Sequence, residues 1–339
     1  MGSSLGTSGI TINLHQNNPI YFTDEPLSGT VCWNNRHETV RTSTVYIILI
    51  GEVGYTAQRM AFNPSDGTRK AVTEFHYTKF YSSKISLVDS PFENELIVLS
   101  RGQYSWPFEF ILSNYLPPTI NSRKYDPHVR YYLQVVIEKS SWYKSNIEEL
   151  QYLTIYPRIN LPPNSPWLQR SFFEDQNKNE ISLKGFISKT CFIPGESIEF
   201  TIEIDNPREF RIKHIDLSIF QSLEIATNSK QMNIFQTILP SIQDTNGRQI
   251  KETISVTAPA VSLPPSCQFQ GGSEEPVSIL NRYFIKLAAD VEGISMNFDI
   301  EIPIIIATEP GSCACQSSAL IPQYDEPPPS YDSVVKHIK

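Results

Sequence analysis

The chain has 339 residues, of which 40% are hydrophobic and 19% charged, and its formal net charge is −8 at pH 7. This length suggests about two domains, and the composition is that of a globular protein rather than a disordered one. The acidic balance argues against nucleic acid as the main partner, because nucleic-acid-binding proteins usually carry a basic signature.

The N-terminal segment 1–10 has neither the basic region nor the apolar stretch of a secretory signal peptide. The longest apolar runs, 45–50 and 302–307, are too short to span a bilayer. The chain also contains no Asn-x-Ser/Thr glycosylation acceptor. We therefore expect a cytoplasmic protein rather than a secreted adhesin.

Alternation of apolar and polar residues with a period of two is the main local pattern in the chain. Residues 196–205 are typical, since every second side chain is apolar and those between are polar or acidic. Pro107 falls on the polar face of such a segment, which favours an edge strand or a bulge there. Further apolar rows are Ile10, Ile12 and Leu14; Tyr104, Trp106, Phe108, Phe110 and Leu112; Leu133, Val135 and Ile137; Ile198, Phe200, Ile202 and Ile204; Tyr283, Ile285 and Leu287; and Phe298, Ile300, Ile302 and Ile304.

The chain repeats itself, because residues 10–31 resemble residues 181–202. Placing Glu25 on Glu196 aligns Tyr21 with Phe192 and Ile12 with Leu183. Leu-Pro-Pro also precedes a tyrosine-bearing strand in both halves, at 116–118 and at 263–265, and the first half carries an extra stretch around 60–95. Such a duplication is typical of two similar domains in tandem.

These patterns predict an all-β protein of two tandem antiparallel Ig-like β-sandwich domains with a disordered, proline-rich C-terminal tail. The tail is expected to be flexible because it is rich in Ser, Pro and Gly and lacks alternation. The predicted boundaries are 9–158 for the first sandwich, 159–180 for the connection, 181–307 for the second sandwich and 308–339 for the tail.

Five short segments follow one another along the chain: PIYFTDEPLSGTV (19–31), LSRGQYSWPFEFILSNYLPPTI (99–120), VRYYLQVVIEK (129–139), CFIPGESIEFTIEIDN (191–206) and IEIPIIIA (300–307). In this order they resemble the arrestin family, and most closely its arrestin-domain-containing (α-arrestin) branch. The resemblance covers roughly residues 10–307 and implies the arrestin fold. Thr23-Asp24-Glu25 departs from the family's usual Pro-Gly-Glu turn, and Ser113-Asn114 stands where a proline is usual. No phosphate-binding residues are assigned, because nothing matches the phosphate sensor of the receptor-binding arrestins.

The tail contains Pro328-Pro329-Ser330-Tyr331, which fits the Pro-Pro-x-Tyr ligand motif of WW domains. Proline fixes φ, so the segment favours an extended polyproline helix before a partner binds, and little entropy is lost on docking. Pro328, Pro329 and Tyr331 are therefore the predicted WW-binding residues. Pro322 and Tyr324 form a degenerate second candidate that lacks the first proline of the motif.

The resemblance implies an adaptor that recruits WW-domain HECT-type ubiquitin ligases to membrane-protein cargo and so promotes ubiquitination, endocytosis and endosomal sorting. The implied partners are those ligases and the cytosolic segments of membrane receptors or transporters. The implied location is the cytoplasm, with recruitment to the plasma membrane and endosomes. The alternative is an arrestin-fold trafficking or signalling scaffold, like the arrestin-like subunit of retromer, whose tail does not recruit a ligase.

No catalytic, cofactor or metal site is predicted, because no nucleophile motif, phosphate loop or dinucleotide glycine pattern occurs. An enzyme with a dispersed site remained a weaker alternative. Cys313 and Cys315 could be acylated or bind a metal, although two ordinary tail cysteines are the favoured interpretation. Residues 123–130 and 206–214 could form basic patches for an acidic membrane surface, with solvated turns as the favoured interpretation.

Overall fold

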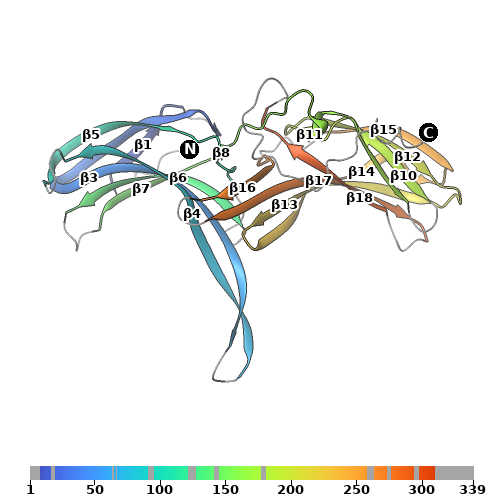
Figure 1. Ribbon diagram of the computed structural model, residues 1–339, viewed down its shortest axis with the longest axis horizontal. Coiled ribbons are helices and arrows are strands. Elements are labelled where there is room, and N and C mark those ends of the chain that lie inside the picture. The colour runs from blue at the N-terminus through green and yellow to red at the C-terminus, as the bar shows by residue number, and fades with distance from the viewer. Residues whose placement is uncertain are drawn as a thin grey trace. The chain divides into compact units, whose positions relative to one another are not determined.

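The computed structural model describes residues 8–16, 20–62, 65, 67–90, 95–120, 127–140, 145–176, 181–257, 263–272, 276–293 and 298–309. These residues form β-strands almost throughout, with a single 3-10 turn at Pro166–Leu168 among them. They fall into two compact units that divide after Tyr156, and Gln270–Val277 groups with the first unit. The predicted all-β class with two sandwich domains is confirmed (Figure 1).

The first unit is organised around one very long strand that pairs with different neighbours along its length. The first half of β3 pairs with β1 and β5, and its second half pairs with β4 and β6, while β7 pairs with β6. The pairing with β5 shifts register between Asn35 and Thr39 and ends at Thr42, where the pairing with β6 begins. The strands are β1 (Ile10–Leu14), β2 (Tyr21–Phe22), β3 (Pro26–Phe62), β4 (Arg69–Asp89), β5 (Ile97–Ile111), β6 (His128–Lys139), β7 (Ile147–Leu153) and β8 (Ile155–Tyr156).

The core of the first unit is filled from both halves of β3. Val31 and Trp33 are buried in the first half, and Ile47 and Leu49 in the second. In β5, Phe108 and Phe110 are buried and Pro107 is exposed, and among the described strands β5 pairs only with β3. The prediction of an edge strand at Pro107 is therefore confirmed, since proline removes a donor that an edge strand can spare.

The second unit is a sandwich of two sheets. One sheet has the order β15-β12-β10-β9, and the other has the order β11-β18-β17-β13-β14, with β16 also pairing to β17. The strands are β9 (Ser171–Gln176), β10 (Ser182–Ile187), β11 (Cys191–Phe192), β12 (Ser197–Asp205), β13 (Ile212–Ile225), β14 (Asn228–Thr245), β15 (Gln249–Thr257), β16 (Cys267–Gly271), β17 (Val277–Val291) and β18 (Phe298–Ile306).

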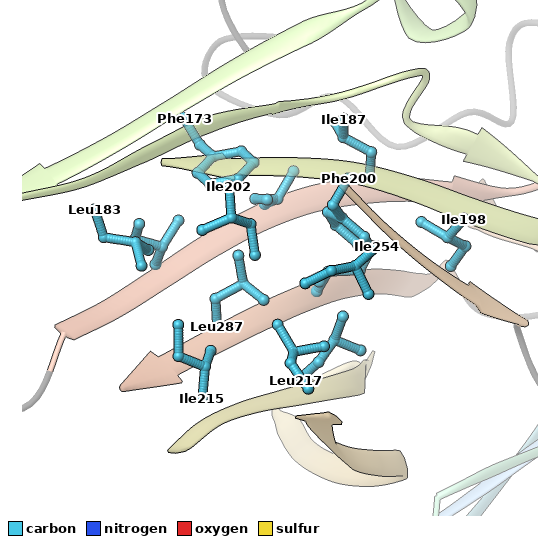
Figure 2. Close-up of a cluster of buried hydrophobic side chains, with 14 of the residues drawn as sticks. Phe173, Leu183, Ile187, Ile198, Phe200, Ile202, Ile215, Leu217, Ile254 and Leu287 are labelled. Carbon is cyan, nitrogen blue, oxygen red and sulfur yellow. The ribbon is translucent and has the colours of Figure 1, made fainter. Parts of the chain in front are cut away.

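Apolar side chains of the two sheets face one another in the middle of this sandwich (Figure 2). Phe200 and Ile202 of β12 meet side chains of the opposite sheet such as Leu217 and Leu287. All four are almost completely buried, as the period-two pattern predicts for the inward face of each strand.

The same backbone arrangement closes both units, which confirms the internal repeat. The Thr119 amide donates to the Ile155 carbonyl, and the Ile155 amide donates to the Thr119 hydroxyl oxygen, both at 2.8 Å. Ser266 and Ile306 form the same two hydrogen bonds, both at 2.9 Å. Tyr21 pairs in parallel with Ile155, and Phe192 pairs in parallel with Ile306. Tyr21 and Phe192 are thus structurally equivalent, as the sequence alignment predicted.

The equivalence of Ile12 and Leu183 was wrong by two positions. Ile10 pairs with Trp33, and Leu183 pairs with Ile204, which holds the place of Trp33 in the second unit. Leu183 therefore corresponds to Ile10. A shift of two keeps the same side chains on the buried face of the strand, so alternation alone could not detect it.

Candidate interaction surfaces

The segment that leads into the C-terminal tail is tied to the connection between the two sandwiches. The Ile159 amide donates to the Thr308 hydroxyl oxygen at 2.7 Å, and the Thr308 amide donates to the Ile159 carbonyl at 3.1 Å. Arg158 forms an ion pair with Glu309. The start of the tail is therefore held beside residues 157–159.

The predicted WW-binding residues Pro328, Pro329 and Tyr331 lie outside the described residues. The same holds for the second candidate, Pro322 and Tyr324, and for Cys313 and Cys315.

In the segment 206–214, a candidate basic patch, two cations are opposed by carboxylates. Arg211 lies 2.9 Å from Asp244 and 3.7 Å from Glu292. Lys213 lies 3.2 Å from Asp290. The surface at this segment has mixed charge, which fits the solvated turn that we favoured. Of the other segment, 123–130, the structure describes only the last four residues.

A long two-stranded extension of the first unit was not predicted. The pairing of β3 with β6 ends at Gly54, opposite His128, but the pairing of β3 with β4 continues to Phe62, opposite Arg69. We call residues 55–62 and 69–76 the β3–β4 ribbon. Its eight cross-strand pairs span about 27 Å at the usual rise of an antiparallel strand. Figure 1 shows this ribbon running away from the sheet that it continues.

Large apolar side chains are exposed on the ribbon. Met60 is 61% exposed and Phe62 is 62% exposed, and Phe75 and Val72 are also open to solvent. Cross-strand registration places Phe62 opposite Arg69, Met60 opposite Ala71 and Thr56 opposite Phe75. The sequence indicated an insertion here, as the extra stretch around 60–95. The alternation of apolar and polar residues does not indicate where β3 stops pairing with β6.

The base of the ribbon is closely packed at Gly54. A Cβ atom at this position would lie 2.4 Å from Cε1 of the buried His128 ring. The aromatic rings of Tyr77 and His128 lie 6.1 Å apart, and those of Tyr55 and His76 stack at 5.2 Å. These contacts connect the ribbon to the body of the sheet.

The described ranges show neither a cluster of metal ligands nor a helix that could span a membrane. Those residues contain no group of three or more His, Cys, Asp and Glu side chains that could hold a metal ion. Nor does any helix among them have the length and apolar character needed to cross a membrane. Cys191 and Cys267 are buried free thiols, and burial raises the pKa of both.

The two units thus define a tandem β-sandwich protein. Residues 10–162 match the family model for the arrestin (or S-antigen) N-terminal domain, and residues 177–311 match that for the arrestin (or S-antigen) C-terminal domain. The chain belongs to the arrestin family, whose members act as scaffolds and adaptors that bind cargo receptors and trafficking machinery.

A curated relative agrees with the arrestin-domain-containing branch. The chain is similar to arrestin domain-containing protein C of Dictyostelium discoideum, with 25% identity over 126 residues. The match covers 36% of this chain and 19% of that relative. The chain therefore matches about a fifth of that relative's length.

Proposed function

We propose that this protein is an adaptor that brings WW-domain HECT-type ubiquitin ligases to membrane-protein cargo. The observation that carries the proposal is Pro328-Pro329-Ser330-Tyr331 in the same chain as two arrestin domains. The arrestin domains would hold cytosolic segments of receptors or transporters, and the ligase would then ubiquitinate the cargo for endocytosis and endosomal sorting. The protein would work in the cytoplasm and be recruited to the plasma membrane and endosomes.

The chemistry of the motif supports this role. Consecutive prolines favour the polyproline conformation, so Pro328 and Pro329 can dock on the paired aromatic rings of a WW domain at a low entropic cost. Tyr331 would fill the neighbouring pocket. Because single short motifs bind weakly, Pro322 and Tyr324 would add affinity as a second site.

The attachment of the tail supports the same role. Thr308 and Glu309 are fixed to residues 158–159, and residues 310–327 separate them from the motif. A chain of that length can span at most about 65 Å. The arrestin domains would therefore limit how far a docked ligase can lie from bound cargo.

The test is binding of the full chain to isolated WW domains. We expect Pro329→Ala and Tyr331→Ala each to weaken binding at least about tenfold, because each removes a group that fills a recognition pocket. Ser330→Ala is the matched control, since that position of the motif accepts any residue. Unchanged binding by the Pro329 and Tyr331 variants would show that the motif is not a WW ligand.

The alternative is a trafficking or signalling scaffold whose tail does not recruit a ligase, and the family-model match that ends at residue 311 leaves the motif outside it. Truncation before Pro310 separates the two functions while sparing Thr308 and Glu309, which hold the connection. An adaptor would lose ubiquitination of its cargo after this truncation. A scaffold would keep both its partners and its effect on cargo.

A further inference from the structure

The outer end of the β3–β4 ribbon has an unusual composition. Its last four cross-strand pairs join residues 59–62 to residues 69–72, and they contain only apolar and cationic side chains. The three cations, Arg59, Arg69 and Lys70, are exposed, as are Met60 and Phe62. A local excess of positive charge thus lies at the outer end of the ribbon, in a protein whose formal net charge is −8.

Both faces of the ribbon's outer end carry apolar and cationic side chains. Side chains alternate across a strand, so Phe62, Met60 and their cross-strand partners share one face with Phe75 farther along the ribbon. The other face carries Arg59, Lys70 and the exposed Val72, with Arg59 also lying 3.5 Å from Glu74. Each face of the outer end therefore combines exposed apolar side chains with at least one cation.

Such a ribbon is poorly suited to remain surrounded by water. Two-stranded ribbons are at best marginally stable in water by themselves, and here large apolar side chains stay exposed as well. The ribbon cannot enter the hydrocarbon core of a bilayer, because its strand edges would carry backbone groups without partners. The headgroup region suits it, since water and headgroups can satisfy those edges.

We propose that the outer end of the β3–β4 ribbon docks on an anionic lipid surface. Phe62 and Met60 insert between headgroups, and Arg69, Lys70 and Arg59 contact lipid phosphates and carboxylates while their alkyl stems lie along the interface. Charge complementarity selects this partner, because the last four pairs offer cations and apolar groups and no carboxylate. The site goes beyond the proposed function, since it needs neither the tail nor a ligase.

The test is co-sedimentation of the full chain with vesicles of phosphatidylcholine alone and of phosphatidylcholine with phosphatidylserine at about two to one. We expect binding to the mixed vesicles only, and weaker binding as salt is raised, because salt screens exposed charges. Met60→Ser with Phe62→Ser should lower partitioning at least about tenfold. Arg69→Gln and Lys70→Gln should each lower it about fivefold.

Matched controls come from exposed residues outside the ribbon. Val98→Ser with Ile111→Ser removes two exposed apolar side chains of β5, and Arg101→Gln removes an exposed cation there. These controls should bind vesicles as the unaltered chain does. Thermal unfolding should confirm that the ribbon variants remain folded, since the substituted side chains are exposed.

Several results would overturn the proposal. These are failure of the unaltered chain to bind the mixed vesicles, equal binding to both vesicle types, or an equal loss in the β5 controls. Ribbon variants that bind vesicles normally but lose a protein partner would assign the ribbon to protein contact instead. Tyr331→Ala should leave vesicle binding unchanged, so failure here is distinguishable from failure of the ligase proposal.

Discussion

The Tyr131 hydroxyl donates a hydrogen bond of 2.6 Å to the carbonyl of Pro117, and both residues are buried. The second unit repeats the arrangement, since the Tyr283 hydroxyl donates to the Pro264 carbonyl at 2.7 Å. Both prolines follow the leucine of a Leu-Pro-Pro segment. Proline supplies no amide hydrogen, and the tyrosine satisfies the carbonyl that the turn leaves in the interior.

Removing either hydroxyl should destabilise the protein. We expect Tyr131→Phe to lower the free energy of unfolding by about 1–2 kcal/mol, because it removes the tyrosine hydrogen bond to the buried Pro117 carbonyl. Tyr283→Phe should cost less, because the Pro264 carbonyl also accepts a hydrogen bond of 3.3 Å from the Asn281 amide. Chemical denaturation measures the change. Tyr152→Phe is the control, since the side chain of Tyr152 is 61% exposed. Equal stability of the Tyr131 and control variants would show that the bond contributes nothing.

Asp24 and Gly195 occupy equivalent left-handed positions in the first turn of each unit, with φ of 65° and 85°. Left-handed backbone costs a residue with a Cβ roughly 1–2 kcal/mol, although Asp tolerates it better than most. We therefore expect Gly195→Ala to lower the free energy of unfolding by about 1 kcal/mol or more, and Asp24→Gly to leave it unchanged or raise it slightly. Thermal denaturation of both variants checks the opposite signs. A destabilising Asp24→Gly would mean that the Asp24 side chain itself supports the turn.

Asn281 connects a buried polar network in the second unit. Its amide nitrogen donates to the Pro265 carbonyl at 2.9 Å, and its oxygen accepts a hydrogen bond of 2.8 Å from Gln221. We expect Asn281→Leu to lower the free energy of unfolding by about 2–4 kcal/mol. The Pro265 carbonyl would lose the Asn281 donor, and the Gln221 amide would lose its acceptor.

Gln221→Leu and the double variant complete a thermodynamic cycle. The double variant should cost less than the sum of the single variants, because the second substitution removes a group that the first left unpaired. Additive costs would show that Gln221 and Asn281 do not act together.

Buried thiols should make stability depend on pH in the alkaline range. Burial raises the pKa of Cys191 from 9.0 to about 12, with a nearby Lys189 opposing and Glu196 adding to the effect. The folded state therefore holds its proton more tightly than the unfolded state. This contribution to stability is fully present below pH 9 and is lost as pH rises toward the pKa of about 12.

Thiol labelling tests the burial directly. In a Cys313→Ser and Cys315→Ser background at pH 8, we expect Cys32 to react readily and Cys191 and Cys267 to react only on unfolding. Rapid labelling of Cys267 in the folded protein would contradict its complete burial.

The sequence by itself determined which side chains face inward. Apolar rows such as 198–204 are buried because alternation along a strand directly assigns side chains to faces, whatever the strand's partner. The repeat also aligned Tyr21 with Phe192 correctly, and Pro107 correctly indicated an edge strand. The WW-binding residues stay a prediction from sequence, since they lie outside the described residues.

Only the tertiary structure decided strand register, strand partners and the positions where pairing ends. Leu183 corresponds to Ile10 and not to Ile12, because a shift of two preserves every buried face. Only the structure shows that the pairing of β3 with β6 ends at Gly54 while its pairing with β4 continues as the β3–β4 ribbon. The local sequence of β3 does not indicate where a strand distant in sequence stops pairing with it. Asp24 adopts a left-handed backbone conformation that costs a residue with a side chain conformational energy. The folded structure offsets this cost, so the local sequence does not predict the conformation.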